Sequence, residues 1–280
     1  MILVTGGEGL LGRSLAALSS PERPVVALGR GDLDITDSEA GVAVLDRFKP
    51  CAVINAAALT DVDRCEREPD AARQANVDGP RVLASACASR GIRFVHVSTD
   101  FVFDGRQTTP YTCLDTPNPL SVYGQTKYEG EQAVRAAAPD AIIARTSWVF
   151  GPGGKNFASR LLEFAAKSNT LKGITDMRSL PTYAPDLAAR LLQLVAIGEP
   201  GIYHVTGGGE PATWFDVARF ALDCAGRTDV TVLPVTAVEL GLPAHRPPYS
   251  VMTCVLSRRL GLPELRDWRS AMAEFVRRSP

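Results

Sequence analysis

The 280-residue sequence has no marked excess of charge of either sign, because 30 Lys and Arg residues face 31 Asp and Glu residues and leave a net charge of −1. Both signs are mixed along the chain, which disfavours a nucleic-acid or membrane-surface partner. The sequence also lacks any apolar run approaching the roughly 20 residues that cross a bilayer. A strand is expected from Met1 onward, so we expect no signal peptide. These features favour a cytoplasmic protein without nucleic-acid or membrane partners.

Cysteine and histidine are scarce and dispersed. The six cysteines show no CxxC pair and no dense spacing, which indicates reduced thiols rather than a disulfide framework. The three histidines are isolated from one another, and His96 and His204 both fall within predicted strands. We therefore expect hydrogen-bonded structural histidines there, and a protein zinc site is not predicted.

The sequence does contain a regular alternation of strands and helices. Short apolar runs predict strands at 1–5, 24–28, 51–55, 93–98, 140–145 and 201–205. Helical patterns lie between them, at 13–18, 36–48, 69–89, 121–137 and 185–196. Thr36 and Glu39 have the spacing of a capping box. Such alternation predicts an α/β fold with a doubly wound parallel (Rossmann) sheet, whose ligands bind at the carboxyl ends of the strands.

A glycine-rich turn joins the first predicted strand to the first helix. Its glycines, Gly6, Gly9 and Gly12, fit the pattern GxxGxxG, and Gly7 gives a GxGxxG alternative. Either version lets backbone N–H groups approach a pyrophosphate at the amino end of a helix, where the helix dipole favours negative charge. The context of a strand before and a helix after favours a dinucleotide site over a turn without a ligand.

The second predicted strand ends in Gly29 and Arg30, where an acidic residue would hold a free ribose 2′-hydroxyl. An arginine there suits a 2′-phosphate, so NADPH is the predicted cofactor. Asp32 and Asp34 follow closely and leave NADH as the alternative.

Tyr123 and Lys127 are four residues apart in a predicted helix, so their side chains are expected on one face. A phenol with an ordinary pKa near ~10 is a weak acid, and an adjacent cation is expected to lower that pKa. Thr99, at the end of the strand predicted at 93–98, offers a hydroxyl to the same substrate oxygen. We therefore predict the reduction of a carbonyl group. A nicotinamide would supply the hydride, and the set of Thr99, Tyr123 and Lys127 would donate the proton.

Beyond residue 150 the sequence is richer in proline and glycine, which predicts a smaller lobe. The helix and strand predicted between 185 and 205 return to the earlier pattern, so the lobe is interleaved with the sheet domain. The predicted division is 1–150 plus 183–205 for the Rossmann domain and 151–182 plus 206–280 for the substrate lobe.

Several stretches together carry a family resemblance. The glycine-rich start, Asn55-Ala56-Ala57-Ala58, the run STDFVFDG from Ser98 and the YGQTK of Tyr123 to Lys127 resemble an extended short-chain dehydrogenase/reductase. The run ARTSWVFG at 144–151, Pro181-Thr182-Tyr183-Ala184 and the RPPYS at 246–250 resemble, more narrowly, the dTDP-4-dehydrorhamnose reductase family. The resemblance covers essentially the whole chain. It implies NADPH-dependent reduction of the C4 ketone of a dTDP-4-keto-6-deoxysugar, with dTDP-L-rhamnose as product.

The resemblance also implies residue roles. Catalysis is assigned to Thr99, Tyr123 and Lys127, and the sugar is expected to face Asp100 and Trp148. Arg246 is expected to meet the substrate diphosphate. The implied cofactor contacts, added to Gly6, Gly12 and Arg30, are Gly9, Leu10, Leu11, Asp34, Ile35, Ala56, Ala57 and Ala58.

The sequence departs from the family at two places. A DQxGxPT-like segment is usual, and here 176–182 reads DMRSLPT, so a different dTDP-4-keto-deoxysugar is the main alternative substrate. Some members dimerise through magnesium held by glutamates, and Ser14 stands at the early one, so no metal is predicted. We expect a monomer or a homodimer.

Other functions on this fold have less support. A dehydratase would carry an Asp-Glu pair, whereas Asp100 is followed by Phe101. An epimerase has no motif in its favour. The chain also resembles the non-catalytic, NADP-binding regulatory subunit of methionine adenosyltransferase. The complete set of Thr99, Tyr123 and Lys127 argues against a purely binding role, because a binding protein needs no proton donor.

Overall fold

The computed structural model describes residues 1–154 and 156–278. Its centre is a six-stranded sheet in the order β10-β5-β4-β3-β1-β2, and each neighbouring pair is parallel. Chain order reverses at β1, which has β2 on one side and β3 on the other, and ligand crevices form at such a reversal. The predicted doubly wound parallel sheet is confirmed. Its strands are β1 (Ile2–Thr5), β2 (Val25–Leu28), β3 (Ala52–Asn55), β4 (Arg93–Thr99), β5 (Ile142–Thr146) and β10 (Gly201–His204).

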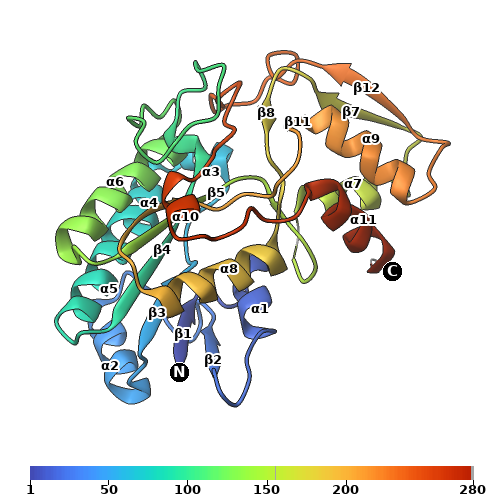
Figure 1. Cartoon of the computed structure of the whole chain (residues 1–280). Helices are drawn as coiled ribbons and strands as arrows, with labels where there is room; N and C mark the ends of the chain where they lie inside the picture. Colours follow the sequence, from blue (N-terminus) through green and yellow to red (C-terminus); the bar gives the residue numbers. More distant parts are fainter. Residues whose placement is uncertain (155, 279–280) are drawn as a thin grey trace.

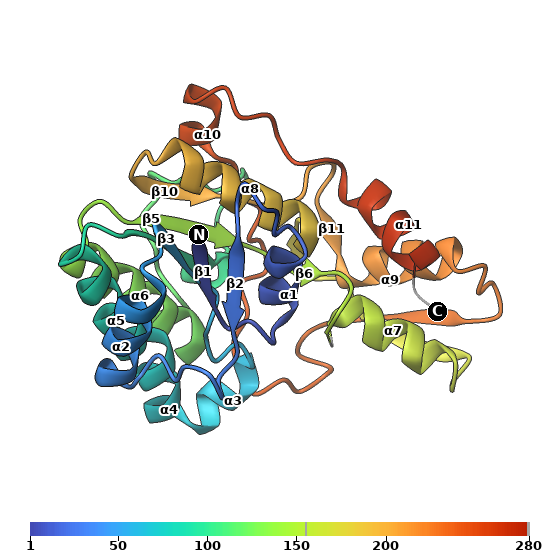
Figure 2. The same ribbon diagram turned by 90° about the horizontal axis from the view of Figure 1, so that it is seen from below.

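Helices cover both faces of this sheet (Figures 1 and 2). On one face lie α1 (Leu10–Ala16) and α8 (Ala184–Ile197), which pack against each other. The other face is covered by α2 (Ser38–Phe48), α5 (Gly79–Ala88) and α6 (Val122–Ala137). The carboxyl ends of the strands are left accessible between the two layers.

The side chains of each apolar strand pack into two hydrophobic cores, one on each face of the sheet. Ile2 and Val4 of β1 share one core with Leu191 of α8, whereas Leu3 between them shares the other with Leu45 of α2. Successive side chains of a strand point to opposite faces, so a sheet buried on both faces needs an unbroken apolar sequence.

The start of α2 differs from its prediction. Its N-cap is Asp37, whose Oδ1 accepts backbone N–H groups of the first turn at 3.0 Å. The predicted capping box of Thr36 and Glu39 is therefore wrong. The Thr36 hydroxyl instead donates to Asp34 at 2.7 Å, which ties down the turn between β2 and α2.

The helix predicted over 69–89 is present but is not regular throughout. It consists of α4 (Pro69–Arg73), a π-helical turn η1 (Gln74–Asp78) and α5. A short helix before it, α3 (Val62–Arg67), was not predicted. In the π turn, Asn76 accepts the backbone N–H of Leu59 at 2.9 Å and donates to Thr126 at 3.1 Å. The irregular turn thus joins the loop after β3 to α6.

The remaining elements lie mostly beside the sheet, at the right of Figure 1. Their core is rich in aromatic residues, with Trp268, Phe275 and Tyr183 buried in it. By contrast, α10 (Val255–Arg259) packs against β10, and the 3-10 turn η2 (Asp100–Val102) directly follows β4. None of the helices described is both long and apolar enough to cross a membrane. The pairs and helices beside the sheet are β6 (Val149–Phe150) with β9 (Thr182–Tyr183), β7 (Thr170–Ile174) with β12 (Thr231–Val235), β8 (Arg178–Ser179) with β11 (Ala212–Thr213), α7 (Phe157–Ala165), α9 (Trp214–Cys224) and α11 (Trp268–Arg278).

Candidate active site

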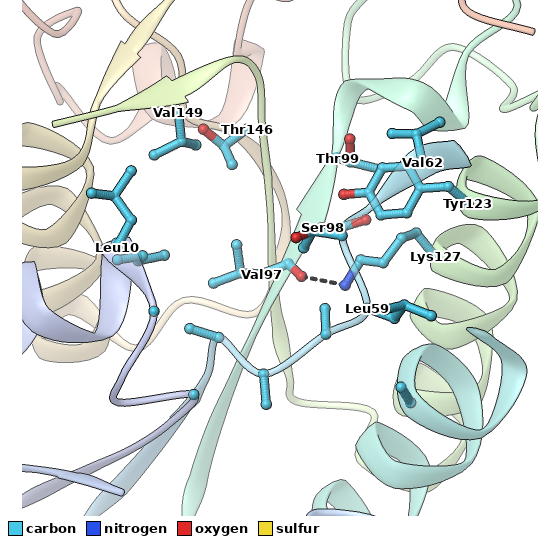
Figure 3. Close-up of a pocket in the computed structure, with 18 of the residues that line it drawn as sticks. Leu10, Leu59, Val62, Val97, Ser98, Thr99, Tyr123, Lys127, Thr146 and Val149 are labelled. Atoms are coloured by element: carbon cyan, nitrogen blue, oxygen red, sulfur yellow. Dashed lines mark hydrogen bonds between the residues drawn. The ribbon is translucent and has the colours of Figure 1, made fainter. Parts of the chain in front are cut away.

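A cavity of about 880 Å³ lies over the carboxyl ends of the central strands. Figure 3 shows Leu10 on one side of it and Tyr123 and Lys127 on the other, with the end of β4 between them. The structure therefore brings all the predicted site residues to one place. The lining includes Gly6, Gly9, Leu10, Leu11, Gly12, Arg30, Asp34, Ile35, Ala56, Ala57, Ala58, Thr99, Asp100, Tyr123, Lys127, Trp148 and Arg246.

The glycine-rich turn is packed too tightly for larger residues. Gly6 has a φ of +71°, which favours glycine, and a Cβ on Gly12 would lie 2.3 Å from the Gly6 carbonyl oxygen. The N-cap of α1 is Gly9, so no side chain caps this helix. As a result the first turn of α1, with Leu10 and Leu11, borders the cavity through its backbone.

Arg30 also lines the cavity; its side chain is 85% exposed and is ion-paired to Asp34 at 3.2 Å. Hydrogen bonds from the Thr36 hydroxyl and backbone N–H lower the pKa of Asp34. Asp32 accepts the backbone N–H of Gly29 at 2.9 Å, so this carboxylate is engaged in its own turn. The exposed guanidinium of Arg30 is therefore accessible to an anionic group that binds beside the turn after β2.

Tyr123 lies in the first turn of α6, whose N-cap is Ser121. Its ring meets Phe101 edge-on at 5.6 Å, and a Thr99 hydrogen bond reaches its hydroxyl. Burial raises the pKa of Tyr123, and the Thr99 hydrogen bond opposes this only in part. The expected lowering of the phenol pKa by Lys127 is not found, because the desolvation of a fully buried phenol is the larger effect.

Lys127 points from α6 to the end of β4 rather than to the phenol. Its Nζ donates to the Val97 carbonyl oxygen at 2.7 Å, the contact drawn in Figure 3, and lies 3.4 Å from His96 Nε2. Burial lowers the pKa of Lys127 to about 8, and the nearby Glu131 carboxylate works in the opposite direction. The amine can therefore lose its proton near physiological pH.

Asp100 lies behind Thr99 and is only 2% exposed. Its Oδ1 accepts from the Thr99 hydroxyl at 3.1 Å, and its Oδ2 accepts from Ser250 at 2.5 Å and Ser179 at 3.4 Å. Burial raises the pKa of Asp100 to about 6, although these hydroxyls stabilise the carboxylate. Both oxygens are thus engaged with protein groups, and Asp100 holds Thr99 in place.

Trp148 supplies a flat wall. Its φ of 44° is unusual for a bulky residue, and such strained backbone clusters at functional sites. The indole stacks on that of Trp214, with 3.8 Å between the ring centroids. The Trp214 ring in turn packs against Phe157, with 4.1 Å between the centroids. Trp214 and the buried Met177 of the 176–182 segment also line the cavity, and Trp214 was not predicted there. Trp214 directly follows Thr213, the N-cap of α9, and this local pattern indicates the start of a helix but not a cavity.

Two further residues complete the lining. Arg246 Nη2 pairs with Asp63 at 2.9 Å, and its Nη1 donates to the Ala244 carbonyl oxygen at 2.9 Å. Thr146, at the end of β5, points into the cavity near Val149 in Figure 3. Its buried Oγ1 has no hydrogen-bond partner among the described residues. A buried hydroxyl of this kind is suited to a polar group of a ligand.

Comparisons with known proteins agree with this geometry. The chain matches the family described as the RmlD substrate binding domain over residues 1–279. It is 40% identical over 279 residues to the dTDP-4-dehydrorhamnose reductase of Streptomyces griseus, covering 97% of this chain and 91% of the relative. It is also 40% identical over 274 residues to the dTDP-4-keto-6-deoxy-D-glucose reductase of Streptomyces niveus, covering 97% of this chain and 95% of the relative.

Among solved structures, the dTDP-4-dehydrorhamnose reductase of Bacillus anthracis in complex with NADP is similar, with a TM-score of 0.96 and 32% identity over 99% of each chain. The family match, the sequence identity and the structural similarity therefore all extend over nearly the whole chain. The chain belongs to the dTDP-4-dehydrorhamnose reductase family, whose members are oxidoreductases of the extended short-chain dehydrogenase/reductase superfamily.

Proposed function

We propose that this protein uses NADPH to reduce the C4 ketone of dTDP-4-dehydrorhamnose, giving dTDP-L-rhamnose. The observation that carries the proposal is the arrangement of Thr99, Tyr123 and Lys127 on one wall of the cavity, facing the first turn of α1. A relative with 40% identity bears the name of this activity. The reaction needs a proton donor at the carbonyl oxygen and a hydride donor at the carbon.

The residues of the glycine-rich turn fit a dinucleotide. Gly6 and Gly12 leave no room for a Cβ, so the backbone of this turn is open to close approach by a pyrophosphate. Leu10, Leu11 and Ala56–58 would hold the dinucleotide along the cavity, with Asp34 and Ile35 at the adenine. When bound, NADPH supplies the hydride. The exposed guanidinium of Arg30 favours NADPH over NADH, because it can meet a 2′-phosphate.

Tyr123 is the proposed proton donor. Burial keeps its phenol protonated in the resting site, which is the form that reduction requires. The carbonyl oxygen becomes strongly basic as the hydride arrives, and it then takes the phenolic proton. In the free site the Thr99 hydroxyl donates to Asp100 Oδ1. When it turns to the same substrate oxygen, it stabilises the developing charge there.

The sugar nucleotide is proposed to lie against the stacked indoles of Trp148 and Trp214. Arg246, at the edge of the cavity, is the proposed partner of the diphosphate. In this arrangement residues 1–150 and 183–205 hold the dinucleotide, while 151–182 and 206–280 hold most of the sugar nucleotide.

A second substrate has a specific observation in its favour. Met177, at the position of the family's usual glutamine, lines the cavity and is 3% exposed. An apolar side chain there removes a hydrogen-bond donor from the sugar site, which favours a sugar with one hydroxyl fewer. Another dTDP-4-keto-deoxysugar is therefore the alternative substrate, and a relative with 40% identity is named as a probable 4-ketoreductase of a dTDP-sugar that lacks one of the ring hydroxyls.

The test is turnover with the purified protein. NADPH absorbance is followed with dTDP-4-keto-6-deoxy-L-mannose as substrate, and the product sugar is identified. We expect dTDP-L-rhamnose, and we expect Tyr123→Phe to lose at least about 10²-fold in kcat. Tyr128→Phe on the same helix is the matched control and should retain the activity. No turnover while NADPH still binds would reject the substrate, and other 4-keto sugars or a binding-only role would then follow.

A further inference from the structure

His96 is a titratable side chain beside the proposed active site that the mechanism above does not use. It lies in the middle of β4 with 0% exposure. Its Nδ1 is 3.0 Å from Asn55 Nδ2 of β3, and its Nε2 is 3.4 Å from Lys127 Nζ of α6. The imidazole therefore bridges the neighbouring strand and the catalytic helix.

The orientation of the Asn55 amide follows from its other partners. Oδ1 accepts the backbone N–H of Ala57 at 3.3 Å and the hydroxyl of Thr5 at 2.6 Å. The Ala57 N–H can only donate, so the amide nitrogen of Asn55 must face His96. His96 Nδ1 then has to accept, and the proton of the neutral ring has to be on Nε2.

This tautomer defines what His96 presents to Lys127. An Nε2–H cannot accept a hydrogen bond from an ammonium group, but it can donate to the lone pair of a neutral amine. Lys127 meanwhile donates to the Val97 carbonyl oxygen at 2.7 Å. The hydrogen bonds thus run in one direction, from Asn55 through His96 and Lys127 to the backbone of β4.

We propose that His96 is a positioning residue of the active site, which donates from Nε2–H to the amine of Lys127 when that amine has lost its proton, and so stabilises the neutral form at the end of β4. The inference rests on the proposed function only where that function places Lys127 in the active site. The contact itself is a property of the free protein.

The surroundings of the pair keep His96 neutral and bring the neutral form of Lys127 within reach of physiological pH. Burial, followed by the charge of Lys127, lowers the pKa of His96 well below its ordinary value. Burial also lowers the pKa of Lys127 to about 8. The carboxylate that acts on Lys127 is Glu131, one turn further along α6, and it is already bound by Arg145 and by Ser98.

The other titratable groups near this wall belong to the phenol rather than to the amine. Tyr123 on α6 is influenced by Asp100 of η2 and Cys65 of α3, both of which raise its pKa. From the side of the sheet, Asn55 and Thr5 are uncharged. From β4, Lys127 therefore meets two polar groups. The Val97 carbonyl oxygen accepts from the amine in either protonation state, and the Nε2–H of His96 favours the neutral one.

The sequence allows a direct test, because it has five lysines and three histidines. Protein labelled with [¹³Cε]lysine and [¹⁵N]histidine is titrated by NMR, with Lys127 assigned from Lys127→Met. His204 is an internal comparison: its Nδ1 faces the carbonyl oxygens of Thr253 and Tyr111 at 2.9 and 3.2 Å. We expect the Nε2–H tautomer for His96 and the opposite Nδ1–H tautomer for His204.

The variant His96→Phe keeps a ring but removes the donor. We expect the pKa of Lys127 to rise by about one unit, the size of a single polar contact. The upper limb of the pH profile of kcat should move by the same amount. His204→Phe, a matched replacement of the other buried histidine, should leave the titration of Lys127 unchanged.

The outcomes separate the two proposals. An Nδ1–H or charged His96 in the wild-type protein would overturn the inference even if the variant does not fold. So would an unchanged Lys127 titration in a folded His96→Phe protein. If the NMR results are as expected but no 4-keto sugar is reduced, the contact stands and the proposed function fails.

Discussion

Replacing Glu131 with glutamine is expected to destabilise the protein by about 3–5 kcal/mol, because it leaves a buried arginine without a counter-ion. Arg145 and Glu131 form a bidentate pair, with Nε to Oε1 at 2.8 Å and Nη2 to Oε2 at 2.6 Å. Their side chains are only 1% and 2% exposed. The Ser98 hydroxyl also donates to Oε1 at 2.5 Å. An amide keeps the shape of the carboxylate but not its charge.

The neighbours of Arg145 cannot take over the missing charge. Its guanidinium lies over the ring of Phe103 at 5.2 Å and donates to His204 Nε2 at 3.4 Å. Burial, together with the charge of Arg145, lowers the pKa of His204 to about 3, so this ring is neutral. Glu131 is the carboxylate paired with Arg145 in the part of the chain that the structure describes. The stability lost in Glu131→Gln is therefore the free energy of leaving the Arg145 cation buried without a counter-ion.

The assay is urea unfolding at pH 7, with Glu129→Gln as the matched control. Glu129 lies on the same helix and pairs with Arg73 at 2.7 Å, but these side chains are 22% and 55% exposed. An exposed pair of this kind contributes at most about 1 kcal/mol. Replacing both Glu131 and Arg145 with apolar residues should recover much of the loss. If Glu131→Gln loses no more stability than Glu129→Gln, the reasoning from burial is wrong.

Three further predictions follow from the cavity. Arg30→Ala should raise KM for NADPH by about tenfold and leave KM for NADH unchanged, because one charge-assisted contact to the 2′-phosphate is lost; an equal effect on both cofactors in steady-state kinetics would contradict it. Asp100 keeps its proton up to about pH 6 when folded and to about 3.8 when unfolded, so its contribution to stability falls as pH rises through this window. Asp100→Asn should therefore be more stable than wild type by about 1–3 kcal/mol at pH 7, with no gain below pH 4, and urea unfolding at both pH values measures this. Gly12→Ala should weaken NADPH binding at least about tenfold, measured by fluorescence titration, because its Cβ would lie 2.3 Å from the Gly6 oxygen. Gly31→Ala, with nothing within 4 Å of the added atom, should bind normally.

The strands and most helices could be predicted because their signals are local. Continuous apolar runs bounded by Gly or Pro identify buried parallel strands without knowledge of their neighbours. Helix α3 (Val62–Arg67) was missed because five of its six residues are polar or cysteine, and it has no apolar stripe. The capping box at Thr36 was predicted wrongly because Thr36 and Asp37 are adjacent and both can cap a helix. The sequence could not show that Asp34 already engages the threonine.

The site was predictable to the extent that its residues stand in motifs. Trp214 comes to the cavity through the folding of a segment far from the glycine-rich turn, and no spacing in the sequence indicates this. Met177 could be connected with the sugar site only through the segment that departs from the family pattern. The protonation states in the site could not be predicted from the sequence either. Burial of the phenol, and not the charge of a neighbouring residue, has the largest effect on the pKa of Tyr123. Helical spacing placed Lys127 on the right face, but only the structure shows that its amine turns to Val97.

The stacked pair of Trp148 and Trp214 has an optical consequence. The two indoles are 3.8 Å apart and nearly parallel, at 11°, so their electronic transitions are coupled. The sequence has three tryptophans, and the third, Trp268, is buried in the core beside the sheet. Coupled indoles give a paired band in the far-ultraviolet circular dichroism spectrum. The cavity therefore carries its own chromophore, and a sugar that separates or tilts the indoles can be followed without a label.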